Sequence, residues 1–73
     1  MNYVKNKSTL VVGDILVKAE DIFIIKDIDL NDGIVYMQHQ NNHKIYMTSY
    51  KHLHINHKFY DPESETICKI SNM

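Results

Sequence analysis

The 73-residue chain has no arginine and no tryptophan, and only one cysteine, one proline and two glycines. A single cysteine, Cys68, excludes an intrachain disulfide and is typical of a reducing compartment. Cys68 stands between Ile67 and Ile70 with no histidine placed beside it by local spacing, so we expect a small core residue and not a catalytic nucleophile. Both glycines, Gly13 and Gly33, fall in predicted turns, which excludes a glycine-rich phosphate loop.

The absence of arginine also bears on nucleic acid. The formal charge is −1, with eight lysines against nine acidic residues. Arginine is the residue best suited to bidentate phosphate contacts, so this balance argues against nucleic acid as the primary ligand. It leaves open a local basic patch, whose candidate members are Lys44, Lys51, His52, His54 and Lys58.

Long hydrophobic runs are missing as well. No stretch approaches the roughly 20 apolar residues of a membrane span, and residues 1–12 contain no apolar run of signal-sequence length. We therefore expect a cytoplasmic protein that does not contact a membrane. The chain is rich in Ile, Asn, Lys and Asp, a composition typical of AT-rich genomes, which favours a low-GC bacterium or a phage that infects one.

The pattern of short apolar segments and turn residues predicts an all-β fold. We expect five to six antiparallel strands in a small barrel or a strongly bent sheet, with a short helical turn near residues 49–53. Residues 1–73 would form one domain with its core in residues 10–60, a closing strand at about 66–70, and an edge strand or frayed arm in residues 1–9. A chain this short is near the lower limit for folding without a disulfide or a metal, so oligomerisation would supplement its stability.

Residues 21–48 form the centre of the predicted fold, as three strands joined by turns at Asn31-Asp32-Gly33 and Asn41-Asn42. Asp-Gly is a strong hairpin signal because both residues tolerate positive φ. A turn at the two asparagines fixes the register of the last two strands. In this register, His39 faces Lys44, Met37 faces Tyr46 and Val35 faces Thr48.

Continuous alternation through these strands predicts a sheet with two apolar faces. One face would carry Ile22, Ile24, Ile28, Leu30, Val35, Met37 and Tyr46, and the other Phe23, Ile25, Ile34, Tyr36, Ile45 and Met47. An antiparallel sheet needs only one buried face, so the second must be covered by a further segment, a second copy, a partner protein or a small ligand. The predicted binding and interface residues are Phe23, Ile25, Tyr36, Ile45, Met47, Tyr46 and Tyr50.

The order of elements resembles Src-homology-3-like small barrels of the Tudor and KOW kind. The resemblance rests on Gly13-Asp14, three meander strands, a short helical turn ending in Leu53, and a final strand. It covers roughly residues 10–60 and involves no signature motif, so another five-stranded barrel or an open antiparallel sheet fits as well. The resemblance implies a binding module that recognises peptides, nucleic acids or other domains.

Residue clusters that could support catalysis or metal binding have simpler explanations. The spacing His52-x-His54-x-x-His57 can place imidazoles on one face of a strand. A structural zinc site requires four ligands, however, and no cysteine or carboxylate is suitably spaced to complete it. We expect these histidines on an exposed turn and edge strand. Asp27, Asp29 and Asp32 lack the further oxygen ligands of a calcium loop. The sequence therefore predicts no enzyme activity, no metal and no cofactor.

The leading functional hypothesis is a small binding protein that acts stoichiometrically, as a homo-oligomer. Its most concrete form is a phage or mobile-element protein that inhibits or sequesters a host component, such as a defence protein. The alternative is a KOW- or Tudor-like accessory module for nucleic acid or ribonucleoprotein, which would use the basic patch.

Overall fold

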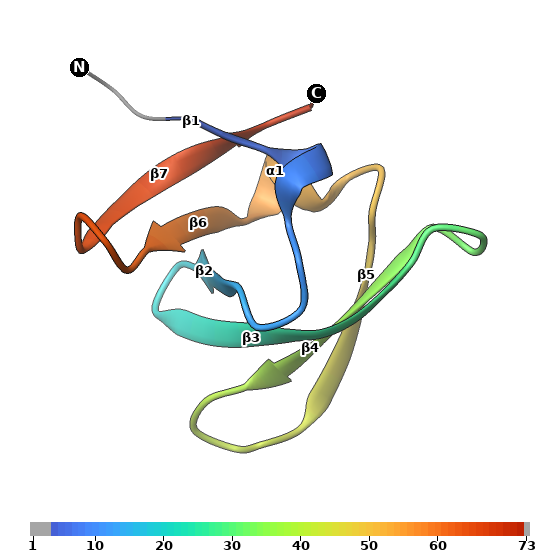
Figure 1. Cartoon of the computed structure of the whole chain (residues 1–73). Helices are drawn as coiled ribbons and strands as arrows, with labels where there is room; N and C mark the ends of the chain where they lie inside the picture. The colour runs from blue at the N-terminus through green and yellow to red at the C-terminus, as the bar shows by residue number, and fades with distance from the viewer. Residues whose placement is uncertain (1–3, 73) are drawn as a thin grey trace.

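The computed structural model describes residues 4–72, which form an all-β fold with one seven-stranded sheet (Figure 1). A 3-10 turn at Lys7–Thr9 and a single helical turn, α1, accompany the strands. Neither is long or apolar enough to cross a membrane. The elements are β1 (Val4–Asn6), β2 (Ile15–Lys18), β3 (Asp21–Asp29), β4 (Ile34–His39), β5 (Ile45–Ser49), α1 (Leu53–Asn56), β6 (Lys58–Asp61) and β7 (Thr66–Ser71).

The strands lie in the order β1-β7-β6-β2-β3-β4-β5. Every neighbouring pair is antiparallel except β1 and β7, which are parallel. The predicted all-β class is confirmed, but the sheet is mixed and has more strands than the five to six predicted, because the N-terminal segment adds a strand beside β7. Residues 1–3 of the predicted N-terminal arm lie outside the described residues. Within residues 4–72 no pairing joins β5 to β1, so this part of the sheet is open.

The predicted register of the last two meander strands is confirmed. Val35 pairs with Thr48 and Met37 with Tyr46, and the His39 N–H donates to the Lys44 carbonyl at 2.9 Å. The predicted helical turn is displaced, because the Tyr50 N–H still bonds the Gly33 carbonyl at 2.8 Å and extends the hairpin. The helical turn therefore begins only at Leu53.

A β-bulge in β3 reverses the side-chain alternation that the sequence predicted. Ile25 pairs with Met37 but Asp27 pairs with Tyr36, so Lys26 is an extra residue without a partner on β4. One extra residue moves every side chain before it to the other face. The predicted faces are therefore wrong for the first half of β3: Phe23 and Ile25 join the core, with 5% and 0% of their surfaces exposed.

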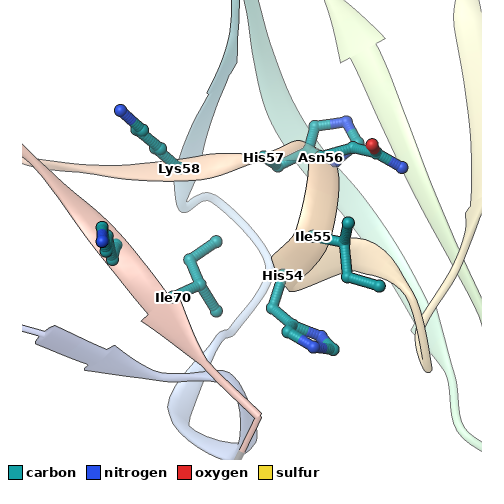
Figure 2. Close-up of a pocket in the computed structure, with 7 residues that line it drawn as sticks. His54, Ile55, Asn56, His57, Lys58 and Ile70 are labelled. Carbon is teal, nitrogen blue, oxygen red and sulfur yellow. The ribbon is translucent and has the colours of Figure 1, made fainter.

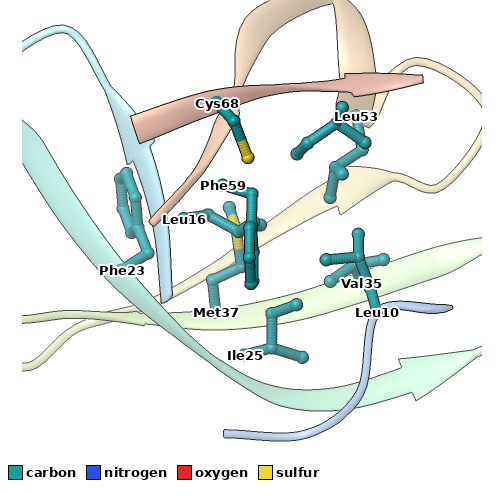
Figure 3. Close-up of a cluster of buried hydrophobic side chains, with 10 residues drawn as sticks. Leu10, Leu16, Phe23, Ile25, Val35, Met37, Leu53, Phe59 and Cys68 are labelled. Carbon is teal, nitrogen blue, oxygen red and sulfur yellow. The ribbon is translucent and has the colours of Figure 1, made fainter. Parts of the chain in front are cut away.

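The core lies inside the curl of the sheet and receives side chains from both of its halves (Figure 3). One row of paired residues crosses five strands, from Cys68 on β7 through Phe59, Leu16 and Phe23 to His39 on β4. Every member of that row is buried. Strand β7 contributes Cys68 and Ile70 to this core. The members of the core are Leu10, Leu16, Phe23, Ile25, Val35, Met37, Leu53, Phe59, Cys68 and Ile70.

The bulge can be tested with two adjacent substitutions in β3. Ile25→Ala should lower the free energy of unfolding by about 2–5 kcal/mol, because a fully buried isoleucine leaves a cavity. Ile24→Ala, on the opposite face, should cost about 1 kcal/mol or less. Urea denaturation followed by circular dichroism measures both. Equal losses, or a larger loss for Ile24→Ala, would contradict the bulged register.

Candidate functional site

The outer face of the sheet carries an apolar patch over β3, β4 and β5. Ladder pairing places Ile24 beside Gln38 and Gln38 beside Ile45, and it places Tyr36 beside Met47. Ile22 lies two residues from Ile24 on the same face. We call these side chains the outer patch, whose apolar members are Ile22, Ile24, Tyr36, Ile45 and Met47.

Several members of the outer patch are exposed to an extent that is unusual for large apolar side chains. Met47 is 68% exposed, Ile45 54% and Ile22 45%. Neither these residues nor Gln38 between them carries a charge, and the charged Asp27 lies beside Tyr36 on β3. Depletion of charge at the centre of an exposed apolar surface is typical of protein interfaces. The predicted binding residues Tyr36, Ile45 and Met47 therefore share one surface.

The other predicted binding residues do not belong to the outer patch. Phe23 and Ile25 are core residues, and Tyr46 lies on the inner side of β5, with its ring centroid 5.6 Å from that of Phe23. Tyr50 packs against the core, and the buried Lys7 places its Nζ atom 4.7 Å from the Tyr50 ring centroid. That Nζ also donates to Asn72 Oδ1 at 2.7 Å, so this contact joins the two ends of the described chain.

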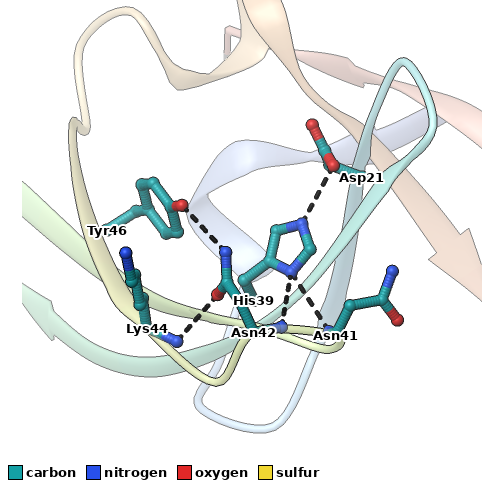
Figure 4. A network of polar contacts seen from close by, with 6 residues as sticks. All are labelled: Asp21, His39, Asn41, Asn42, Lys44 and Tyr46. Carbon is teal, nitrogen blue, oxygen red and sulfur yellow. Dashed lines mark hydrogen bonds and ion pairs between the residues drawn. The ribbon is translucent and has the colours of Figure 1, made fainter.

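Tyr46 instead takes part in a polar network centred on His39 (Figure 4). The His39 Nδ1 accepts hydrogen bonds from the backbone N–H groups of Asn41 and Asn42, at 3.1 and 3.3 Å. Its Nε2 atom lies 2.9 Å from Asp21 Oδ1, and since Nδ1 is an acceptor, Nε2 carries the proton and donates it. The Asn42 side chain donates to the Tyr46 hydroxyl at 3.1 Å. The network holds the β4–β5 loop against the β2–β3 turn.

The five candidate members of the basic patch do not form one surface. Lys44 precedes β5, whereas Lys51 and His52 follow it, so the length of that strand separates them. Two of the five, His54 and Lys58, instead line an open cavity of about 190 Å³ between α1 and the β6–β7 hairpin, together with Lys69 (Figure 2). Its lining residues are His54, Ile55, Asn56, His57, Lys58, Lys69 and Ile70.

The predicted exposure of the histidine series is wrong for His57, which is 5% exposed because the chain turns inward at the end of α1. Its Nδ1 lies 3.2 Å from the Leu53 carbonyl and donates to it. Burial lowers the pKa of His57, the Leu53 hydrogen bond opposes this shift, and the charge of Lys18 adds to it. His54 Nδ1 is also buried, and no described residue hydrogen-bonds it.

The described residues contain no group of three His, Cys, Asp or Glu side chains arranged to hold a metal ion. Cys68 is buried in the core, as predicted, and burial raises the pKa of its thiol. A thiol with a raised pKa stays protonated near neutral pH, and the thiolate is the reactive species. Cys68 is therefore a packing residue.

The fold and these surfaces show an all-β protein with an apolar face of its sheet exposed. Comparison of this chain with protein-family models, with curated proteins and with solved structures gives no match. Any role for the outer patch or for the cavity beside α1 is therefore argued from the residues that form them.

The environment of His57 predicts that stability falls in mild acid. The unfolded chain binds a proton on this imidazole near pH 6.5, whereas the folded chain resists it until lower pH, so protonation favours unfolding. The free energy of unfolding should decline as pH falls below about 6.5, by at most about 1.4 kcal/mol per pH unit from this group.

His57→Asn should flatten that decline, and His52→Asn, at an exposed position, should leave it unchanged. Urea titrations at several values between pH 7.5 and pH 5 measure the difference. A wild-type slope in the His57→Asn variant would show that another group causes the decline.

Proposed function

We propose that this chain is a small, non-catalytic binding protein that forms a stoichiometric complex with another protein through the outer patch. The observation that carries the proposal is the exposure of large uncharged side chains on β5, led by Met47 at 68%. A patch spread over the outer face of three strands suits a protein surface, whereas small ligands bind in concave pockets.

The structural part of the proposal is that β2 to β6 form an Src-homology-3-like unit. The meander of β3, β4 and β5 is followed by α1 and then by β6, which pairs with β2. This is the order of elements on which the resemblance rests. It supports a binding module, since such units mostly recognise peptides, nucleic acids or other domains.

The composition supports a more concrete version of the proposal. A chain rich in Ile, Asn, Lys and Asp, encoded by an AT-rich genome, is consistent with a phage or mobile-element protein that inhibits or sequesters a host component. In such a protein the outer patch would cover a surface that the host component needs for its own activity.

Tyr36 offers the best substitution for testing the proposal, because it lies on the central strand of the outer patch. Tyr36→Lys places a lysine opposite Asp27 on β3, so the sheet should tolerate it. The variant should lose the partner with a cost of about 2 kcal/mol or more, typical of removing an interface tyrosine. The measurement is retention of a stoichiometric partner from host extract by the immobilised chain, followed by calorimetric titration with the purified partner.

Val11→Lys is the matched control, since Val11 is 58% exposed in the turn before β2 and lies outside the outer patch. This variant should retain the partner at wild-type affinity. Equal binding by Tyr36→Lys and the wild type, or equal loss in both variants, would refute the role of the outer patch.

The second candidate function is nucleic-acid binding, and the cavity beside α1 favours it. Lys58 precedes Phe59 and Lys69 follows Cys68, and because these strands pair antiparallel at Phe59 and Cys68, the two lysines are neighbours. Both line the cavity with His54. The lining residues include no carboxylate. Such a site suits a backbone phosphate, which lysine binds as a point charge.

If this second function holds, oligonucleotide affinity should fall steeply with salt. The double substitution Lys58→Ala with Lys69→Ala should reduce the slope of log K against log salt concentration by about 2, one for each phosphate contact. Fluorescence anisotropy over a salt series measures both quantities. Binding that does not depend on salt, or an unchanged slope in the double variant, would reject this function.

A further inference from the structure

Strand β5 ends the sheet, and its hydrogen-bonding pattern leaves one side of its backbone free. The His39 N–H bonds the Lys44 carbonyl, and the Tyr50 N–H bonds the Gly33 carbonyl. In an antiparallel ladder, bonds to one neighbour recur at every second residue. Tyr46 and Thr48 therefore direct their backbone groups toward β4, as do the Lys44 carbonyl and the Tyr50 N–H. Ile45, Met47 and Ser49 direct theirs away from the sheet.

Except for the Ser49 carbonyl, the backbone groups on this free side have no hydrogen-bond partner among the described residues. The Ser49 carbonyl accepts the His52 N–H at 3.2 Å, but no described side chain or turn bonds the N–H or carbonyl groups of Ile45 and Met47. An unpaired row of this kind is a template for another strand.

Strand β5 also lacks the features that normally keep an edge strand from pairing. Its sequence, Ile-Tyr-Met-Thr-Ser, contains no charge and no proline. Its pairing with β4 is continuous over five residue pairs, without a bulge. Charged side chains, prolines and bulges are the usual protections of an edge. The three large side chains at its start are between 41% and 68% exposed.

We propose that β5 pairs with β5 of a second copy of this chain, antiparallel across a two-fold axis at Met47. This register brings the free backbone groups of both copies together, because Met47 then faces Met47 and Ile45 faces Ser49 of the partner copy. Two-fold symmetry requires such a self-complementary segment. The two sheets join into one, and the outer patches of both copies become continuous.

The charges beside β5 favour a second copy as the occupant. In this register Lys44 of each copy lies opposite Tyr50 of the other, so no lysine faces a lysine along the paired strands. The uncharged strand between them meets an identical uncharged strand, so the pairing brings no like charges opposite each other. This inference concerns the edge of the sheet and holds whether or not the outer patch binds another protein.

Met47→Pro tests the pairing through the backbone. The Met47 N–H points away from β4, so proline at this position removes no bond within the sheet, and edge strands accept proline there. Wild-type protein should have the mass of a dimer by sedimentation equilibrium, and Met47→Pro should have that of a folded monomer. Met47→Ala, which keeps the N–H group, should remain a dimer with weaker association.

Tyr36→Lys should keep the wild-type mass, which separates this test from that of the outer patch. A wild-type monomer at millimolar concentration, or a dimer of the folded Met47→Pro variant, would overturn the pairing.

A charge pair at the same position decides the register, and it also covers the case in which Met47→Pro does not fold. Met47→Lys and Met47→Asp each place two like charges opposite each other across the two-fold axis, so each alone should be a monomer. An equimolar mixture should form a one-to-one heterodimer. Dimers of either single variant, or failure of the mixture to associate, would exclude pairing about Met47.

Discussion

The bulge at Lys26 is the constraint on which the rest of the structure depends. Strand β3 pairs with β2 along its first half and with β4 from Phe23 to Asp29. Without the extra residue, Ile25 and Ile28 would lie on opposite faces of the sheet. The bulge turns Phe23, Ile25 and Ile28 to the same side, so both halves of the sheet close on one core.

The same change determines what remains outside. Once Phe23 and Ile25 enter the core, Ile22 and Ile24 join Tyr36, Ile45 and Met47 on the outer face. Residues 4–72 hold no further segment to cover that face, because the remaining strands and α1 already close the core. The outer patch and the free edge of β5 both result from the small size of the core. Strand β5 belongs to both, because it carries Ile45 and Met47 and is the last strand of the sheet.

The buried polar groups serve the connections between elements. His39 fixes the β4–β5 loop through two backbone N–H groups and the β2–β3 turn through Asp21. Lys7 stacks on Tyr50 and reaches Asn72, so it fastens the N-terminal segment beside the last strand. The His39 and Lys7 side chains both have hydrogen-bond partners, which offsets the cost of burying them. The contacts of His39 with Asp21 and of Lys7 with Asn72 leave no local signal in the sequence, since the partners lie 18 and 65 residues away.

Local chemistry was sufficient to predict the all-β class, the turn at Gly33, the pairing of Met37 with Tyr46 and the burial of Cys68. These features depend on turn residues and short-range alternation, which act within a few positions. Only the tertiary structure decided which face of β3 is the core, that His57 is buried, and that Lys44 lies apart from Lys51. Lys26, a lone charge in an apolar alternation, is compatible with either a regular strand or a bulge. The choice between them depends on packing against residues as distant as Leu53 and Ile70, whose position no local pattern specifies.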